Sequence, residues 1–285
     1  MRKCLFIFVM LLASAAFAQI TSGTIIILNF TKDRLVIAAD SRGVNTDTWV
    51  PHDNECKIAE VDHRLIFTSV GNARRGRSSG LDRVNGWDNA ETTRIAFRSV
   101  RLLPTEEAQT RTIAKTWADA IAAHWQSLYR SEPDKVTRVL SKSGGLTVGA
   151  FAEANKGTIY FRAAQIRFDR SRATAGDPIG PEFIERLSDC WDCGEGNRIC
   201  AMGKHFDVAA RFCAQTKSSD KIKVRTHLKS ANRAVKLAVK IAELTVDAYE
   251  KTPGDVGGMV DAVTLKNNGS ITWNAIKDGC EDAQQ

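Results

Sequence analysis

The residues best able to do chemistry lie at the ends of short apolar runs in the first seventy positions of this sequence. Thr24 begins one run, Asp40 and Arg42 follow the next, Lys57 begins another, and Gly71 ends the last. Short apolar runs bounded by polar residues are typical of β-strands. Strand ends that meet at one edge would gather a hydroxyl, a carboxylate, a cationic side chain and an unobstructed backbone N–H. Such a set suits attack by the hydroxyl on a carbonyl carbon.

A second hydroxyl nucleophile is suggested by Gly76-Arg77-Ser78-Ser79-Gly80, which matches the pattern G-x-S-x-G. That pattern works as a nucleophile elbow when a strand runs directly into the turn and a helix leaves it. The nearest predicted strand ends at Val70, and the residues after the motif are rich in Gly and Asn. A serine hydrolase that uses Ser78, with Asp169 and His205 as acid and base, is therefore the lesser alternative.

The cysteines indicate disulfides in an oxidising compartment more than a metal site. The sequence has 7 of them, one of which, Cys4, lies in the N-terminal apolar segment. Zinc sites usually combine two closely spaced pairs, whereas the cysteine-rich segment, with the spacing C-x2-C-x6-C-x12-C, has only one. An even count in an exported chain favours disulfides, and their connectivity stays open. The weaker candidates for zinc ligands are Cys190, Cys193, Cys200 and Cys213.

No motif for a bound cofactor stands out. Gly194-Glu195-Gly196 lacks the third glycine and the preceding strand of a dinucleotide loop. The sequence contains no G-x4-G-K-[ST] phosphate loop, and its 5 histidines are scattered. We therefore expect neither a cofactor nor a resident metal.

The N-terminus is typical of a secretory signal peptide. Met1-Arg2-Lys3 precedes an apolar run over 5–13, and Ala16-Phe17-Ala18 forms a small-x-small cleavage site. The run is too short for a membrane-spanning helix. We therefore predict a signal peptide over 1–18, a secreted or periplasmic protein, and no membrane attachment once the signal is removed.

The composition is that of an ordinary globular protein, with 43% hydrophobic and 26% charged residues in a chain of 285. The net charge of +7 falls to +5 without the signal peptide, which carries Arg2 and Lys3. That charge is mild, and the densest basic stretch, over 74–83, has no aromatic platform on which bases could stack. We therefore expect no nucleic-acid partner.

The elements that must position these residues alternate between sheet and helix. The pattern predicts strands over 24–28, 35–39, 49–50, 57–61, 64–70, 146–151, 158–168, 260–265 and 270–273. Apolar residues at helical spacing predict helices over 91–103, 105–131 and 232–251. Residues 170–231 look irregular, which indicates an elaborated connection.

The order sheet, helices, sheet, helix, sheet fits two antiparallel sheets between helical layers better than a repeated βαβ unit. We therefore predict an α+β fold, specifically a four-layer αββα sandwich. No internal repeat or linker divides the chain, so we expect a single domain.

Several short segments follow the order of a known family. They are Gly23–Ile27, Val36–Arg42, Cys56–Ile58 and Val70–Ala73, followed near the C-terminus by Ala238–Ala248 and Gly257–Asp261. Together they resemble the β-subunit family of the proteasome, which belongs to the N-terminal nucleophile (Ntn) hydrolases. The spacings from Thr24 to Asp40 and from Lys57 to Gly71 are the family's own, and that from Asp40 to Lys57 is one residue longer.

The resemblance implies a threonine nucleophile. Thr24, as the first residue of the mature chain, would supply the hydroxyl and, through its α-amine, the base. An α-amine titrates near ~7.7–8.0, and a nearby Lys57 ammonium would disfavour its protonated form while Asp40 orients Lys57. The N–H of Gly71 would bind the oxyanion.

The resemblance also implies maturation in two steps. Removal of the signal peptide would leave a short propeptide over 19–23, and self-cleavage between Gly23 and Thr24 would then free the α-amine. The expected organisation is a signal peptide, this propeptide, and one Ntn hydrolase-like domain over 24–285 with a cysteine-containing insert at about 170–231.

Some positions depart from the family's pattern. Lys204 stands where a serine belongs, while Pro253 and Val256 stand where an aspartate and a serine belong, with Asp255 only approximately in place. In the family these groups support the nucleophile's amine; here supporting roles are left to Asp255 and to Arg42, which would brace the strand ends. Two readings stay open: an exported threonine peptidase or other amide hydrolase, and a catalytically degenerate protein with a binding or structural role.

The first reading implies a peptide or protein substrate and no cofactor. The family assembles into stacked rings that are fed by ATP-driven unfoldases. An exported chain has no ATP to drive such a partner, so we expect a free-standing homo-oligomer or a monomer.

Overall fold

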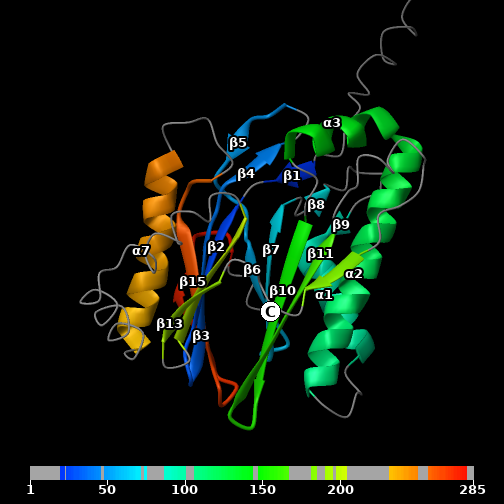
Figure 1. Ribbon diagram of the computed structural model, residues 1–285. Helices are drawn as coiled ribbons and strands as arrows, with labels where there is room; N and C mark the ends of the chain where they lie inside the picture. Colours follow the sequence, from blue (N-terminus) through cyan, green and yellow to red (C-terminus); the bar gives the residue numbers. More distant parts are fainter. Residues whose placement is uncertain are drawn as a thin grey trace, which may run out of the picture.

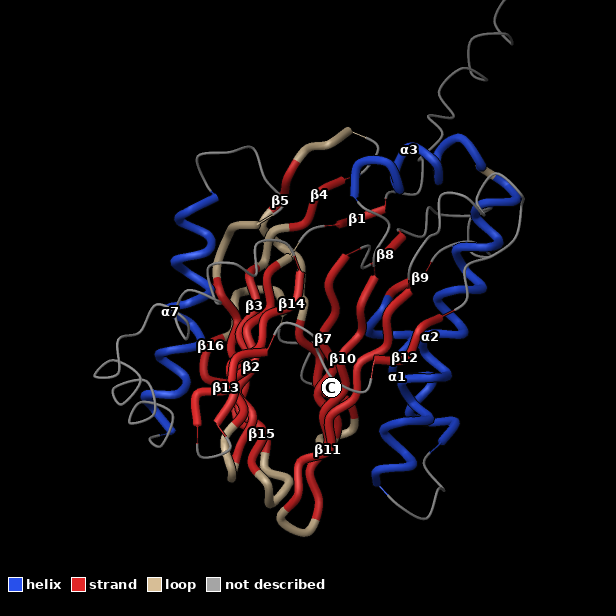
Figure 2. Tube along the Cα trace, in the orientation of Figure 1, coloured by secondary structure: helices blue, strands red, loops and turns tan. Residues whose placement is uncertain are grey.

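The computed structural model describes residues 20–22, 24–45, 48–71, 74–75, 87–100, 106–143, 147–166, 181–184, 190–194, 197–203, 231–249 and 256–280. Within these ranges the chain forms three antiparallel sheets and four helices, with helices on two sides of the strands (Figure 2). The predicted signal peptide and much of 170–231 lie outside the described residues. So do Gly23, Ser78, Asp169, Lys204, His205, Cys213, Pro253 and Asp255.

The largest sheet has six strands in the order β13-β14-β2-β3-β15-β16, each antiparallel to its neighbours. They are β13 (Cys190–Gly194), β14 (Asn197–Gly203), β2 (Ile25–Phe30), β3 (Arg34–Asp40), β15 (Val260–Lys266) and β16 (Ile271–Ala275). The β2–β3 hairpin lies at its centre, and its turn is closed by the Thr31 N–H, which donates to the Arg34 carbonyl (2.9 Å). The apolar runs predicted at 24–28 and 35–39 thus form the two middle strands.

The second sheet has five antiparallel strands in the order β12-β11-β10-β7-β6. They are β12 (Pro181–Ile184), β11 (Thr158–Ile166), β10 (Thr147–Asn155), β7 (Leu65–Gly71) and β6 (Ile58–Val61). The β10–β11 hairpin turns at Lys156 and Gly157, which both have positive φ (49° and 83°). Two such residues in a two-residue loop match the twist of the flanking strands.

Helices cover the outer faces of the two large sheets, as Figure 1 shows. On one side α7 (Ala231–Tyr249) packs on β2, β3 and β15. Its Ala234, Ala238 and Ala242 are buried against the sheet, because residues four apart share one face of a helix. On the other side α1 (Asn89–Val100) packs on β6 and β7, and α2 (Glu106–Ser131) on β10, β11 and β12. The helix α3 (Pro133–Ser143) follows α2.

The helix α2 buries the aromatic stripe predicted for 105–131. The ring of Trp117 lies 5.5 Å from that of Phe151 and 5.8 Å from that of Phe67, measured between ring centroids. Gly149 makes this approach possible, since a Cβ at that position would come within 2.7 Å of the Trp117 ring. Trp125 is buried in the same core.

A further apolar core fills the space between the two large sheets. Alternate residues of β2 point into it, namely Ile26 and Leu28, while Ile25 and Ile27 point toward α7. This follows from the two-residue period of a strand. Because both faces of these strands are covered, they appear in the sequence as unbroken apolar runs. The second sheet contributes Ile58, Ile66, Val70, Val148, Ala150, Ala152 and Ala163.

A small third sheet forms beyond the ends of β3 and β7. Its order is β5-β4-β1-β8-β9, with β5 (Pro51–His52), β4 (Gly43–Asn45), β1 (Ile20–Ser22), β8 (Arg74–Arg75) and β9 (Trp87–Asp88). The middle strand, β1, comes just before Thr24 in the sequence. It pairs with β4 on one side, where Ser22 lies opposite Val44, and with β8 on the other. No strand was predicted at 20–22 from the sequence.

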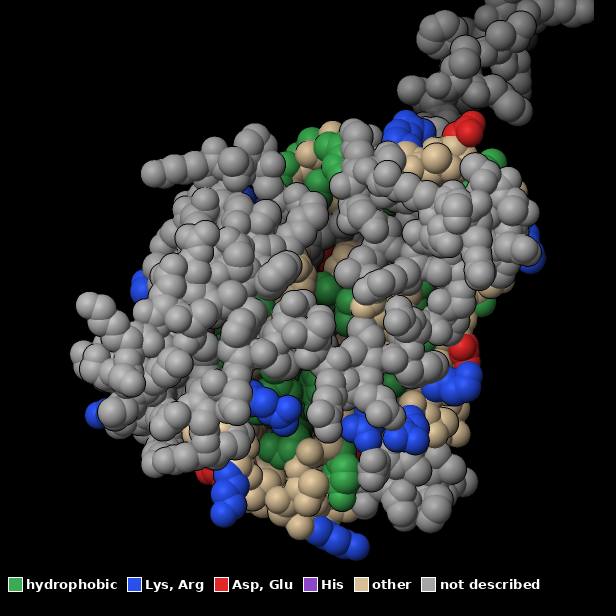
Figure 3. Space-filling model, viewed as in Figure 1, with side chains coloured by type: hydrophobic (Ala, Val, Ile, Leu, Met, Phe, Trp, Pro, Cys, Tyr) green, Lys and Arg blue, Asp and Glu red, His purple; other side chains and the backbone are tan. Residues whose placement is uncertain are grey.

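The described surface can be followed in Figure 3. Hydrophobic side chains show at the middle of the face drawn there, and Lys and Arg side chains lie in separate groups, several of them over its lower half. The large hydrophobic side chains that are exposed, among the described residues, are those of Val50, Ile95 and Met259. None of the described helices is long and apolar enough to cross a membrane.

The structure confirms a mixed class with antiparallel sheets and packed helices, as predicted. Two local predictions were wrong. Within 170–231, β14 is not part of an irregular connection but extends the six-stranded sheet, because Ile199 and Ala201 are buried under α7. Trp49, predicted in a strand, has a positive φ of 59° in the chain before β5.

A disulfide joins Cys56 to Cys280, with their Cα atoms 5.6 Å apart across a sequence separation of 224. It ties the segment before β6 to the segment after β16. Cys200 is disulfide-bonded as well. The expectation of disulfides is confirmed for these cysteines, and Cys200 is excluded as a zinc ligand, because a metal needs the free thiolate.

We predict that the double variant Cys56→Ser/Cys280→Ser has a free energy of unfolding lower by about 2–5 kcal/mol, because a cross-link over so long a loop restricts the unfolded chain. Urea unfolding followed by tryptophan fluorescence would measure the change. In a reducing buffer the variant and the parent should unfold at the same urea concentration. A difference that persisted there would contradict the cross-link as its cause.

Candidate active site

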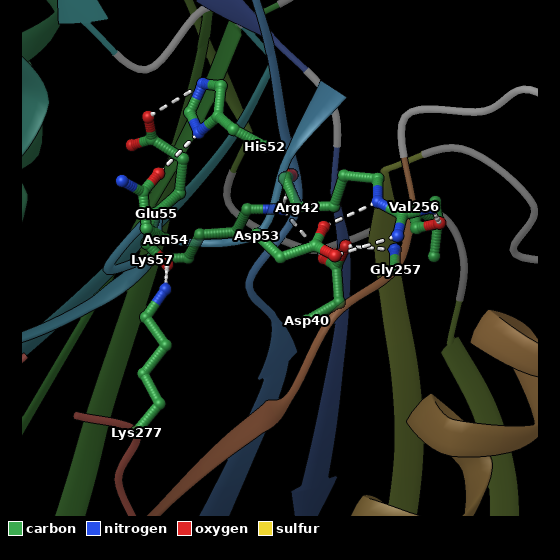
Figure 4. A network of polar contacts seen from close by, with 10 residues as sticks. All are labelled: Asp40, Arg42, His52, Asp53, Asn54, Glu55, Lys57, Val256, Gly257 and Lys277. Carbon is green, nitrogen blue, oxygen red and sulfur yellow. Dashed lines mark hydrogen bonds and ion pairs between the residues drawn. The ribbon is translucent and has the colours of Figure 1, made fainter. Parts of the chain in front are cut away.

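The carboxylate of Asp40 is the centre of a buried polar network at the end of β3 (Figure 4). Its Oδ1 accepts hydrogen bonds from the Ile25 N–H (2.9 Å) and the Lys57 Nζ (2.8 Å), and its Oδ2 accepts one from the Gly257 N–H (2.9 Å). The residue is fully buried, with 0% of its surface exposed. A buried carboxylate is tolerated when it is paired and hydrogen-bonded in this way.

Lys57 is the cationic partner of this carboxylate. It lies just before β6 and is 5% exposed, and its ammonium donates to Asp40 and to the backbone carbonyl of Arg42. Its own carbonyl accepts a hydrogen bond from the Thr68 hydroxyl on β7 (2.8 Å). The strand β7 therefore fixes the lysine backbone while Asp40 fixes its side chain.

Thr24 lies at the start of β2, one residue before the N–H that donates to Asp40, and is 3% exposed. The end of β14 presses against it, since a Cβ at Gly203 would come within 2.1 Å of the Thr24 carbonyl oxygen. The same Cβ would lie 3.4 Å from Val70, the residue before Gly71. The strand ends that carry Thr24 and Gly71 therefore converge, and Gly71 has a positive φ of 89°.

Arg42 connects the end of β3 with two other segments. Its guanidinium forms a two-bond ion pair with Asp53, through Nε to Oδ1 (2.6 Å) and NH2 to Oδ2 (2.9 Å), and its NH1 donates to the Val256 carbonyl (3.4 Å). The backbone N–H groups of Ser41 and Arg42 both donate to the Gly257 carbonyl (3.2 and 3.0 Å). A Cβ at position 257 would come within 2.2 Å of the guanidinium carbon, so any larger residue there would displace the Arg42 side chain.

Of the three positions that depart from the family pattern, only Val256 lies within the described residues. Its side chain is fully buried in the core under α7. The position expected to carry a serine hydroxyl therefore carries a hydrocarbon side chain that contributes to packing. The other departures, Lys204 and Pro253, lie outside the described residues, as does Asp255.

A second group of buried charged residues, Asp261 and Lys277, lies close to the first and was missed from the sequence. The Lys277 N–H donates to Asp261 Oδ1 (2.8 Å), and the Lys277 ammonium donates to the Glu55 carbonyl. Burial raises the pKa of Asp261 and lowers the pKa of Lys277, and the charges of Lys57 and Asp40 act on both. Asp261 breaks an apolar strand, which is a usable sequence signal; no pattern marks Lys277.

A third group of polar side chains lies around Gly43 on β4. Glu55 is 5% exposed, and its carboxylate Oε1 lies 3.5 Å from Nε2 of His52, which also contacts Asn54. In Figure 4 these side chains lie together, well away from Gly257. A Cβ at Gly43 would come within 2.5 Å of the Glu55 Cγ and 2.7 Å of the His52 ring. The place that a side chain at position 43 would take is therefore filled by an acidic and an imidazole side chain.

The alternative sites from the sequence are not assembled by the described residues. Ser78, Asp169 and His205 lie outside them. No group of three or more His, Cys, Asp or Glu side chains within the described ranges could hold a metal ion.

Comparison with known proteins adds a structural likeness. No family model matches the sequence, and no curated protein matches it. Among solved structures, the chain is similar to a Gly-1 mutant of Anbu from Hyphomicrobium sp. strain MC1, with 15% identity, a TM-score of 0.45, and coverage of 92% of this chain and 90% of that one. The function proposed below rests on the chain's own residues.

The Arg42–Asp53 pair should make stability depend on pH in the acid range. The hydrogen bonds from Arg42 lower the pKa of Asp53 below its usual value of 3.8. Because the pKa is lower in the folded state, the pair stabilises the fold above pH 3.8, and this contribution is lost as the pH falls through the folded-state pKa. We predict that Asp53→Asn lowers the free energy of unfolding by up to about 1 kcal/mol at pH 7, since the pair is partly exposed.

Denaturant unfolding at pH 7 and near pH 2 would measure this, and the difference between variant and parent should vanish at the lower pH. Asp33→Asn is the matched control, because the pKa of Asp33 is lowered in the same way by its neighbour Arg34. Both variants should be less stable than the parent at pH 7 and equal to it near pH 2, but only Asp53→Asn should alter processing or activity at Thr24. Identical processing in the two variants would contradict a role for Arg42 in bracing the site.

Proposed function

We propose that this chain is an exported amide hydrolase of the Ntn type, resembling a proteasome β subunit, in which Thr24 becomes the N-terminal nucleophile. The observation that carries the proposal is the double use of Asp40 Oδ1, which accepts from the Lys57 ammonium and from the N–H of the residue after Thr24. Asp40 Oδ1 thereby holds the Lys57 ammonium close to the backbone that carries Thr24. The proposed overall arrangement is an αββα sandwich, supported by α7 on one large sheet and α1 and α2 on the other.

The proposed reaction uses the free α-amine of Thr24 as base. The Thr24 hydroxyl oxygen attacks the substrate carbonyl carbon while its proton passes to the α-amine. The amine then gives a proton to the leaving nitrogen as the C–N bond breaks, leaving an ester on Thr24. Water attacks that ester in the second half-reaction and restores the hydroxyl. The Lys57 ammonium keeps the amine available as a base by disfavouring its protonated form.

The oxyanion that forms in each step needs a hydrogen-bond donor that is already in position before the reaction begins. Gly71 ends β7, and its neighbour Val70 lies beside the Gly203–Thr24 contact. We assign the Gly71 N–H to this role. Loss of one such donor typically costs about 2.7–4 kcal/mol of barrier stabilisation.

The strand β1 supports a peptide as substrate. It runs as an extended strand between β4 and β8 directly before Thr24, so the chain's own N-terminal segment approaches the candidate nucleophile from a β-paired position. Once that segment is cut away, the edges of β4 and β8 are open to another extended peptide. Strand addition of this kind provides affinity through main-chain hydrogen bonds.

Val256 supports the competing reading, a protein that keeps the fold without the activity. Its buried side chain offers no hydroxyl to assist the amine. Cleavage before Thr24 and reactivity of its hydroxyl distinguish an active hydrolase from an inactive protein with the same fold.

We predict that the exported chain begins at Thr24, as read by intact mass and N-terminal sequencing. Thr24→Ala should begin at Gln19, because the hydroxyl that attacks the Gly23 carbonyl is missing. Thr31→Ala, which changes a threonine in the β2–β3 turn, should mature normally. A parent chain that begins at Gln19 would refute the catalytic proposal, and an adduct of a serine-directed fluorophosphonate on Ser78 would favour the serine hydrolase instead.

We predict that Lys57→Met lowers kcat for amide cleavage by about 10²–10³-fold, the usual effect of removing a group that supports proton transfer and charge in the transition state. Lys32→Met, in the exposed β2–β3 turn, should leave kcat unchanged. Unfolding measurements in parallel would reveal any loss of fold. Full activity in folded Lys57→Met would contradict the assigned role.

A further inference from the structure

The pairing of β1 with β4 fixes which part of a bound peptide meets Gly43. Thr21 lies opposite Asn45 and Ser22 opposite Val44. Because the strands are antiparallel, each residue closer to Thr24 on β1 is paired with the residue one position earlier in the sequence on β4. A peptide bound in the place of β1, in the same register, sets its next residue opposite Gly43. That residue is the one whose carbonyl precedes the cleaved bond.

The direction of its side chain follows from the geometry of an antiparallel pair. Residues directly opposite each other project to the same face of the sheet, with Cβ atoms ~4.5–5.5 Å apart. The direction of a Cβ at Gly43 is known, because it would come within 2.5 Å of the Glu55 Cγ and 2.7 Å of the His52 ring. A substrate side chain opposite Gly43 therefore projects beside Glu55 and His52.

The backbone of Glu55 is held in place from several directions. Its N–H donates to the Ser41 carbonyl (2.9 Å), and its carbonyl accepts from the Lys277 ammonium. The next residue, Cys56, is bound to Cys280 by the disulfide. The carboxylate is thus carried on a rigid support, and a preorganised charge loses less in ordering when it binds a ligand.

We propose that Glu55 determines the specificity of this site and selects substrates with Arg or Lys immediately before the cleaved bond; this inference rests on the proposed function. Glu55 is 5% exposed, and its carboxylate has His52 as a neighbour at 3.5 Å. A cationic side chain that enters beside it forms a charge-assisted hydrogen bond in a poorly solvated place, where such bonds are strong. Because Gly43 has no side chain, none stands between the substrate side chain and Glu55.

The test uses the matured protein and three fluorogenic peptides that differ only in having Arg, Leu or Glu before the cleaved bond. The parent should cleave the Arg peptide with the highest kcat/KM. Glu55→Gln keeps the size of the side chain and removes its charge. It should lower kcat/KM for the Arg peptide by about 10- to 100-fold, as expected for loss of a hydrogen bond to a charged group, and should leave the Leu peptide within about twofold.

Glu60→Gln is the matched control, because Glu60 is also a buried glutamate but bonds to Trp273 elsewhere in the fold. It should leave the order of the three peptides unchanged. Cleavage without preference for Arg, or an undiminished preference in Glu55→Gln, overturns the specificity inference alone. If the parent cleaves none of the peptides, the proposed function fails and the specificity inference fails with it.

Discussion

The structure depends on one buried carboxylate. Asp40 has no access to water, so each of its oxygens must be satisfied by the protein, and the donors come from β2, from the segment before β6 and from the segment before β15. Removing one partner of such a buried pair typically costs about 3–5 kcal/mol, because the remaining charge has no compensation. The need to satisfy Asp40 therefore brings three distant segments to one point. The candidate nucleophile Thr24 lies there because its neighbour Ile25 is one of the donors.

The segment after β16 packs next to Lys57, the cationic partner of Asp40. Lys277 reaches the Glu55 carbonyl, and the disulfide from Cys280 to Cys56 holds the residue between Glu55 and Lys57. Two buried lysines close to each other would repel, and the carboxylates of Asp40 and Asp261 reduce that repulsion. The charges of these four residues therefore depend on one another, and removing the charge of Lys277 would change the electrostatic environment of Lys57, although the two are far apart in the sequence.

The sequence was informative where a residue's environment is set locally. The middle strands and the helices α2 and α7 follow from unbroken apolar runs and helical periodicity. It was uninformative where stability comes from a distant partner. Three residues of β1 form a strand only because β4 and β8 flank them. Spacing alone could not pair Cys56 with Cys280, and nothing local marks Lys277. The contact between Asp40 and Lys57 was anticipated because an ordered series of short motifs, and not either residue by itself, pointed to it.

In the proposed function, the position of β1 couples maturation to substrate binding. While residues 20–22 remain attached, they pair with β4 and β8 and fill the place that an extended peptide would occupy. The same attachment keeps the nitrogen of Thr24 in a peptide bond, where it cannot act as a base. One cleavage before Thr24 would therefore produce the base and open the sheet edges together. Under the proposed function an uncut chain would be inert for two independent reasons, so restoring either the amine or the open edges alone would not give an active protein.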